Sequence, residues 1–206
     1  MNVQILGPFN SGTNLIEKII PHKQIIHKHI ICLDEIINVA NKENTLIIIM
    51  YKNIFNWLYS LKKESYSLKF NKLTDRVHFQ DKQYNNVIEV YNTYYRNYIK
   101  LITNCHTNIV WVDYYKLINK SNAYSYLKDK LSMHNVNLVG ELQFLQILNK
   151  PAKNHGNSVQ NSDEALHQYN KNKQLVRSFL MRNKSSLIKE IDLNIIKYFE
   201  PDNTMS

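Results

Sequence analysis

The chain contains short apolar runs of strand length. Residues 3–6, 45–50 and 108–112 are almost continuously apolar, which is typical of strands that are covered on both faces. Residues 24–27 are a fourth, weaker candidate for a strand. Nearly 40 residues separate the first of the three runs from the second, and more than 50 separate the second from the third, so each connection is long enough to contain a helix.

Between the runs, apolar residues recur every three or four positions, the spacing of a helix with one buried face. A first helix is predicted from Thr13, ending at Pro21. The same spacing predicts further helices near 33–40, over 55–61 and over 87–102. Two or three more helices are expected after the last strand, with a loop over 150–162 between them.

Strands that alternate with helices indicate an α/β fold. We predict three layers, a mainly parallel sheet flanked by helices, in a single domain over residues 1–206. Residues 62–84 lack clear periodicity and are predicted to form a long surface segment. Long segments of this kind in compact domains are often functional.

Composition narrows the range of partners. A net charge of +9 and a pI near 9.4 favour a polyanionic ligand. However, 22 Lys stand against 4 Arg, and Arg is the residue suited to planar recognition of bases and phosphates. The abundant Lys, Asn and Ile share A/T-rich codons, and most of the 14 Tyr fall at helical spacing. A small anionic ligand therefore fits as well as DNA, and nucleic-acid binding is the lesser alternative.

Other classes of protein lack their sequence signals. The two cysteines, Cys32 and Cys105, give neither a disulfide framework nor a metal-ligand spacing. No apolar run approaches the ~20 residues of a membrane span, and no signal peptide is visible at the N-terminus. We expect a soluble, cytoplasmic protein that uses no metal and binds no membrane; the sequence leaves the oligomeric state open.

A glycine-containing loop follows the first predicted strand. Residues 7–14 (GPFNSGTN) have the Gly-x-x-x-x-Gly spacing of a phosphate-binding loop. Glycines allow successive backbone N–H groups to point at an anion, and the helix that follows adds its positive end. The residues expected to contact the anion are Gly7, Pro8, Asn10, Ser11, Gly12, Thr13 and Asn14. The alternative is a tight turn in which the glycines serve geometry alone.

The loop lacks the lysine of nucleotide hydrolases. Thr13 and Asn14 stand where the Lys-Ser/Thr of Gly-Lys-Ser/Thr would follow Gly12, so the lysine that reaches the β- and γ-phosphates is absent. Asp113 is the nearest candidate for a Mg²⁺-binding carboxylate. These differences argue against an ordinary ATPase or GTPase.

Three segments resemble motifs of the sulfotransferases that use 3′-phosphoadenosine 5′-phosphosulfate (PAPS). Residues 11–15 (SGTNL) resemble the family's 5′-phosphosulfate loop in its Ser-Gly-Thr-Asn version. Residues 48–60 (IIMYKNIFNWLYS) resemble its Arg-Asp-Pro-x-x-Trp-x-x-Ser motif, and residues 110–117 (VWVDYYKL) its Val-x-Tyr-Glu-Asp-Leu strand end. The motifs occur in the family's order within about the first 120 residues. The resemblance implies the P-loop NTPase-like fold of the sulfotransferase type.

The resemblance also implies a cofactor site. Residues 7–14 would hold the 5′-phosphosulfate of PAPS, while Lys52 and Ser60 would hold the 3′-phosphate. The product would be adenosine 3′,5′-bisphosphate. The sequence departs from the family in that Asn10 replaces the loop lysine and Lys52 replaces an arginine. Lysines that could take the place of the missing loop lysine are Lys18, Lys23 and Lys28.

A histidine is the expected general base. In the family's Lys-x-His pattern, His29 takes the position of the base and His27 that of the lysine. An ordinary histidine pKa lies close to working pH, which suits proton transfer. Glu17 is the alternative proton acceptor. The predicted catalytic residues are thus His29, Lys28 and Asn10.

The acceptor is expected to be a carbohydrate or another small molecule that carries a hydroxyl or amine. Four lysines of the segment after Ser60 suggest an anionic one: Lys62, Lys63, Lys69 and Lys72. In the late loop, Lys153 and His155 are possible contacts to the nucleotide. Two further functions stay open, a catalytically degenerate nucleotide-binding relative and a P-loop kinase-like phosphotransferase.

Overall fold

The structure is a computed structural model of the whole chain. It describes residues 1–21, 28–104, 108–150 and 187–201, together with the isolated positions 163, 164, 166, 167, 171, 174 and 178. The predicted strand over 24–27 and most of the predicted loop over 150–162 lie outside the described residues.

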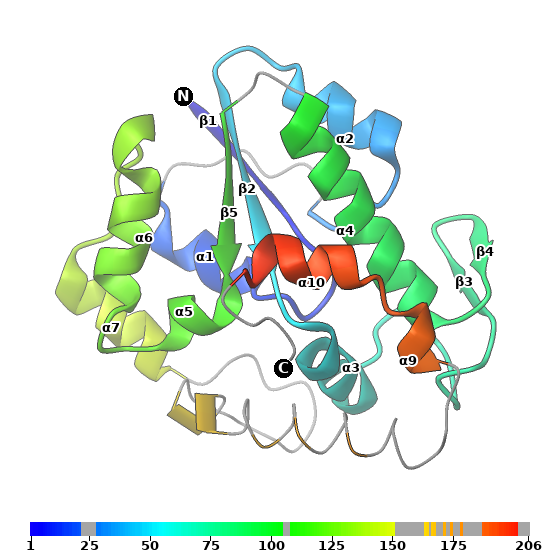
Figure 1. Cartoon of the computed structure of the whole chain (residues 1–206). Coiled ribbons are helices and arrows are strands. Elements are labelled where there is room, and N and C mark those ends of the chain that lie inside the picture. The colour runs from blue at the N-terminus through cyan, green and yellow to red at the C-terminus, as the bar shows by residue number, and fades with distance from the viewer. Residues whose placement is uncertain are drawn as a thin grey trace.

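A parallel sheet of three strands occupies the centre of the described fold (Figure 1). Its strands are β1 (Asn2–Leu6), β2 (Thr45–Tyr51) and β5 (Ile109–Asp113), in the order β1-β2-β5. In register, Ile48 of β2 lies opposite Ile5 on one side and Val110 on the other. The three continuous apolar runs of the sequence form these strands, within a residue or two of the predicted bounds.

Alternate residues of β2 enter two separate cores. Leu46, Ile48 and Met50 pack on one face of the sheet against α1 (Thr13–Ile19), α6 (Ala123–Leu131) and α7 (Glu141–Asn149). Ile47, Ile49 and Tyr51 pack on the other face against α2 (Leu33–Ala40), α3 (Ile54–Lys63), α4 (Val87–Asn104) and α10 (Leu193–Phe199). Helices on both faces of a parallel sheet are the predicted α/β arrangement (Figure 1).

Shorter helices complete the described fold. They are α5 (Tyr114–Ile118), directly after β5, the 3₁₀ turn η1 (Ser132–His134) after α6, and α9 (Leu187–Glu190) before α10. No helix among the described residues is both long enough and apolar enough to cross a membrane.

The prediction for residues 62–84 was wrong at both ends. α3 continues to Lys63, and an antiparallel hairpin forms from β3 (Val77–Phe79) and β4 (Lys82–Tyr84). Gln80 and Asp81 connect the two strands with φ angles of 47° and 59°, the left-handed pair that a two-residue hairpin turn requires. Three-residue strands are too short for visible alternation, and this turn lacks the usual glycine.

Candidate anion-binding site

The predicted site residues meet at one edge of the sheet. Because β1, β2 and β5 are parallel, the residues that follow them lie at the same edge, the usual place for ligands in open α/β folds. Gly7 follows β1, Lys52 follows β2, and Tyr114 follows β5. Figure 1 shows this edge beside the first turns of α1, α3 and α5.

At both glycine positions of the loop, a larger residue would clash with a neighbouring side chain. Gly12 has a φ of 95°, and a Cβ there would lie 2.4 Å from Cδ2 of Tyr114. A Cβ on Gly7 would lie 2.5 Å from Oγ of Ser11. The Ser11 hydroxyl points back into the loop, where it donates a hydrogen bond of 2.7 Å to the carbonyl of Pro8. Ser11 therefore holds the loop's shape in this structure.

Asn10 is tied to the end of α3. It has a φ of 61°, and its Nδ2 donates to the carbonyl of Glu64 at 2.8 Å. The indole of Trp57 donates to the carbonyl of the preceding Phe9 at 2.7 Å. The loop and α3 are thus joined through two hydrogen bonds. The amide of Asn10, predicted to be catalytic, is engaged with main chain.

Lys52 and Ser60 come together as the spacing predicts. Lys52 Nζ donates to Ser60 Oγ at 2.8 Å and to the carbonyl of Asn10 at 3.0 Å, and it lies 4.6 Å from the centre of the Tyr114 ring. Lys52 stands at a strand end and Ser60 about two helical turns later, so both reach one point. A cation, a hydroxyl and the glycine loop therefore share a single location.

The amine of Lys52 is buried and has no carboxylate partner within the part of the chain that the structure describes. The residue is only 6% exposed, and the ion pairs among the described residues involve Lys28, Arg96 and Lys120 instead. Burial, aided by repulsion from Lys63, lowers the pKa of Lys52 from 10.5 to about 7. A buried cation is costly unless an anion compensates it, so this position is suited to an anionic ligand.

His29 lies beside the first residue of the loop. Its Nδ1 is 2.7 Å from the carbonyl of Gly7. A carbonyl only accepts hydrogen bonds, so Nδ1 carries the hydrogen and the lone pair of the neutral ring lies on Nε2. The ring packs 4.2 Å, centre to centre, from that of Phe9. This fixed tautomer is the one a general base needs when Nε2 faces the substrate.

Lys28 is the cation on the α1 side of the loop. Its Nζ lies 3.1 Å from both carboxylate oxygens of Glu17 and contacts Oδ1 of Asn14. Lys18 is exposed in the last turn of α1, and Lys23 and His27 lie outside the described residues. Of the three lysines proposed to replace the loop lysine, the structure places Lys28 at the loop. Glu17, the alternative base, is its ion-pair partner.

Two further side chains belong to this edge of the sheet. Tyr114, to which no role was assigned from the sequence, contacts both Gly12 and Lys52, and burial raises the pKa of its hydroxyl to about 12. Asp113, the nearest candidate for a Mg²⁺-binding carboxylate in a nucleotide hydrolase, accepts from the Tyr115 N–H at 2.8 Å as the N-cap of α5. Burial raises the pKa of Asp113 to about 6. The signal in the sequence that could have identified Tyr114 as a site residue is its position directly after a buried strand.

The lysine-rich segment that begins at the end of α3 adjoins the loop. Beyond the Asn10–Glu64 bond, Tyr66 stacks on Phe9 with ring centres 5.2 Å apart. The lysines of this lysine-rich segment are exposed, namely Lys62, Lys63, Lys69 and Lys72. Lys153 and His155 of the late loop lie outside the described residues.

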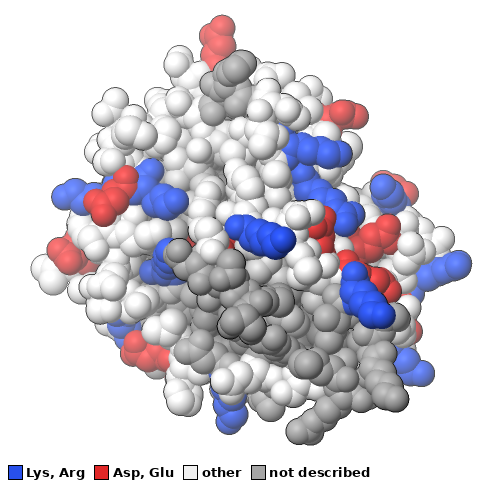
Figure 2. Space-filling view, viewed as in Figure 1, with Lys and Arg blue, Asp and Glu red and all other residues white. Residues whose placement is uncertain are grey.

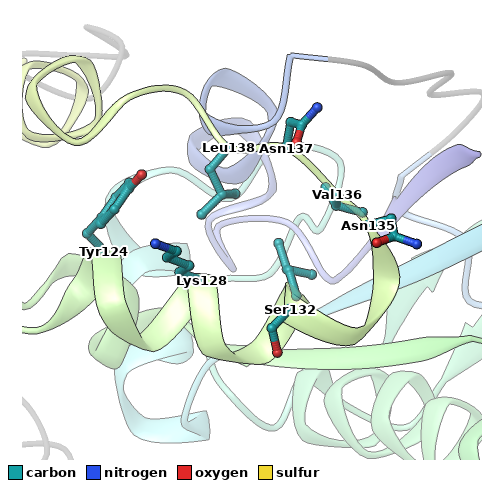
Figure 3. A pocket seen from close by; sticks show the side chains of 8 residues that line it. Tyr124, Lys128, Ser132, Asn135, Val136, Asn137 and Leu138 are labelled. Atoms are coloured by element: carbon teal, nitrogen blue, oxygen red, sulfur yellow. The ribbon is translucent and has the colours of Figure 1, made fainter.

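A separate hollow of about 440 Å³ lies beside α6 and η1 (Figure 3). Its lining is Tyr124, Lys128, Leu131, Ser132, Asn135, Val136, Asn137 and Leu138. None of the predicted site residues contributes to it.

No protein-family model, curated protein or solved structure matches this chain. The chemistry of the site is therefore inferred from its own side chains. They offer a buried cation with a hydroxyl, a glycine loop, a second cation at Lys28, and an oriented imidazole at His29.

Proposed function

We propose that the protein is a sulfotransferase of the P-loop-like type, which moves a sulfuryl group from PAPS to a hydroxyl or amine of a carbohydrate or other small acceptor. The observation that carries the proposal is the meeting of Lys52, Ser60 and the carbonyl of Asn10. Through it, a buried cation with no ion-pair partner among the described residues lies at the glycine loop.

The residues present fit the two anionic ends of PAPS. Lys52 and Ser60 supply an ammonium and a hydroxyl for the 3′-phosphate, whose charge would compensate the buried amine. The loop of residues 7–14 would surround the 5′-phosphosulfate, with Lys28 at its flank. Bound PAPS supplies the activated sulfuryl group.

His29 would act as the general base. With PAPS bound, the acceptor oxygen or nitrogen would form a bond to sulfur as the sulfur–oxygen bond to the 5′-phosphate breaks, and Nε2 of His29 would take up the acceptor's proton. The carbonyl of Gly7 holds Nδ1–H in place and favours the imidazolium that results. Lys28 would stabilise the charge that develops on the departing phosphate.

The acceptor is proposed to carry negative charge. The lysine-rich segment contacts the glycine loop at Glu64 and Tyr66. It has exposed lysines both before and after these two residues. Exposed lysines act as point charges and bind anionic groups without strict geometry. An acidic sugar or peptide would therefore be steered towards His29.

One observation favours a second candidate, a nucleotide-binding relative without turnover. Asn10 stands where the family has its loop lysine, and its amide already donates to Glu64. A kinase-like phosphotransferase has less support, because Asp113 is used as a helix cap. Nucleic-acid binding also has less support. Figure 2 shows Lys and Arg interspersed with Asp and Glu on the face in view, with no continuous basic patch among the described residues there.

Calorimetric titration tests the proposal. Adenosine 3′,5′-bisphosphate is compared with adenosine 5′-phosphate and with Mg²⁺-ATP. We expect binding that requires the 3′-phosphate. In Lys52→Ala or Ser60→Ala, affinity for the bisphosphate should fall by about 10–100-fold, the range of one or two charge-assisted hydrogen bonds, while affinity for the 5′-phosphate changes by less than about twofold.

The matched control is Lys100→Ala, which removes an exposed lysine from α4 and should leave both affinities unchanged. A preference for Mg²⁺-ATP would contradict the proposal, and so would equal losses for the two adenosine phosphates. Binding of the bisphosphate without any sulfuryl transfer from PAPS to a panel of acceptors would favour the degenerate relative.

A further inference from the structure

A buried carboxylate from the far end of the chain lies behind the proposed 3′-phosphate site. Glu200 follows α10 and is 8% exposed. Its Oε1 accepts from the Tyr51 hydroxyl at 2.5 Å and from Asn53 Nδ2 at 2.7 Å. Tyr51 and Asn53 are the two neighbours of Lys52 in sequence, so one oxygen atom holds both sides of the phosphate-binding lysine.

The main chain of Lys52 is held as well. Its N–H donates to the hydroxyl of Tyr95 at 3.0 Å, and its carbonyl accepts from the hydroxyl of Tyr91 at 2.9 Å. The Tyr95 hydroxyl in turn donates to the carbonyl of Met50 at 3.1 Å. Side chains of α4 thus fix the backbone of Lys52. Glu200 fixes the side chains of the two adjacent residues, Tyr51 and Asn53.

Asn53 connects this arrangement to Ser60. Its Oδ1 accepts from the Phe55 N–H at 3.0 Å and so caps α3, while its Nδ2 is held by Glu200. The orientation of the amide therefore links the start of α3 to Glu200. Ser60 lies on the same helix. The turn that carries Lys52 and the helix that carries Ser60 share one anchor.

We propose that Glu200 is a positioning residue, which sets the turn from β2 into α3 so that the amine of Lys52 meets the hydroxyl of Ser60. The identity of the ligand as a 3′-phosphate rests on the proposed function; the positioning of the amine does not. Glu200 suits this place, because its Oε1 accepts from two buried donors at once, and a buried donor left without an acceptor is costly.

Three variants distinguish the hydrogen bonds that Glu200 accepts from its negative charge. Glu200→Ala removes the anchor and leaves the Tyr51 hydroxyl and Asn53 Nδ2 without it. Glu200→Gln keeps an Oε1 that can accept from both donors. Glu190→Ala is the matched control, since Glu190 lies in the same C-terminal region and also accepts from an asparagine, Asn86, away from Lys52.

The first readout is calorimetry with adenosine 3′,5′-bisphosphate and adenosine 5′-phosphate on the full chain. Glu200→Ala should weaken the bisphosphate about tenfold and the 5′-phosphate by less than about twofold. Glu200→Gln and Glu190→Ala should stay within about twofold of the unaltered chain for both. A loss in Glu200→Gln equal to that in Glu200→Ala would show that charge matters instead, and parallel loss of both ligands would show a general structural role.

The second readout needs no ligand. The titration midpoint of Lys52 is followed by NMR of its ¹³Cε, assigned by comparison with Lys52→Arg. The groups that face the amine are Lys63 of α3 and Tyr114 of α5, with Tyr91 and Tyr95 of α4 at its main chain. Glu200→Ala should raise the midpoint by at least about one unit above that of Glu200→Gln, which removes the same charge, as the amine gains access to water.

The two readouts distinguish the two claims. If the unaltered chain binds neither adenosine phosphate, the proposed function fails, and the midpoint alone decides whether Glu200 positions Lys52. Equal midpoints in Glu200→Ala and Glu200→Gln overturn the positioning role whatever the chain binds. If Glu200→Ala does not fold, Tyr51→Phe removes one of the two donors, with an expected rise of about half a unit, and an unchanged midpoint there overturns the role equally.

Discussion

The buried amine of Lys52 links stability to pH. Burial lowers its pKa to about 7 in the folded chain, whereas an unfolded lysine titrates near 10.4. Between these values the unfolded chain binds more protons than the folded one. The free energy of unfolding from this group therefore rises with pH from about 7 to about 10.4 and is constant outside that window.

Anion binding should reverse this shift and take up a proton. A phosphate beside Lys52 favours the charged amine, so at pH 8 binding of adenosine 3′,5′-bisphosphate should absorb close to one proton. Titration in two buffers of different ionisation enthalpy measures this number. Lys52→Arg, which stays charged at all working pH values, should absorb almost none, and an uptake near zero in the unaltered chain would refute a deprotonated resting amine.

Gly12 and Gly140 offer a matched pair of glycines. Gly12→Ala places a Cβ in left-handed backbone and 2.4 Å from Tyr114, so it should lower the free energy of unfolding by about 2–4 kcal/mol. Gly140, the N-cap residue of α7, has a φ of −57° and open space around it, so Gly140→Ala should cost no more than about 1 kcal/mol, because the N-cap preference for glycine is partly offset by the lower entropy of the unfolded chain.

Urea denaturation measures both glycine variants. Adding Tyr114→Ala to Gly12→Ala should recover the steric part of the loss and leave the backbone part. Equal midpoints for Gly12→Ala and Gly140→Ala would contradict the geometry of the loop.

Part of the site was predictable residue by residue. Lys52 and Ser60 are eight positions apart, so the lengths of a strand end and two helical turns bring them together. Glu200 was not predictable, since its partners Tyr51 and Asn53 lie 149 and 147 positions away. No local pattern encodes such a pair. Tyr114 was within a recognised motif, but only the packing of its ring on Gly12 shows its place.

At the level of elements, the hairpin and α4 hold the segment of His29. The carbonyl of His29 accepts from Gln80 Nε2 at 2.7 Å and from the Tyr94 hydroxyl at 2.9 Å. Gln80 Oε1 also accepts from the N–H of Ile31, and the Tyr98 hydroxyl donates to Ile30. The hairpin turn thus acts on the proposed base through its main chain.

Under the proposed function, removal of this support should reduce turnover and spare cofactor binding. For Gln80→Ala, we expect kcat for sulfuryl transfer to fall about fivefold to tenfold, since small displacements of a base are costly, with bisphosphate affinity within about twofold. Amide exchange at Ile31 should accelerate in the same variant. Gln83→Ala, in the exposed part of β4, is the control, and unchanged exchange at Ile31 in Gln80→Ala would contradict the role of the hairpin.

Elements with a strong apolar pattern were predicted well. The β2 run and the 33–40 helix were found within one residue because continuous burial and 3.6-residue periodicity are local properties. The hairpin was missed because its strands have three residues each, and because Gln80 and Asp81 adopt positive φ without glycine. Tertiary contacts of Gln80 with His29 and Ile31 hold that turn.

At the scale of the whole molecule, the three layers of the fold could be predicted from the sequence. The contacts between segments that are far apart in the sequence could not. Alternation of strands and helices was sufficient for the three layers and for the edge at which the site lies. The contacts that brace the site come from α4, the hairpin and the C-terminal region, which are far from the loop in sequence. Such contacts depend on the packed arrangement of both cores.

The Glu200 anchor has a consequence for biosynthesis. Chains are made at about 5–20 residues per second, so roughly 7–30 s pass between the addition of Asn53 and that of Glu200, 147 positions later. The glycine loop, β2 and α3 emerge from the ribosome during that time without the anchor. A nascent chain would therefore have its three described strands before Glu200 fixes the turn at Lys52, and under the proposed function ligand would be captured only late in maturation.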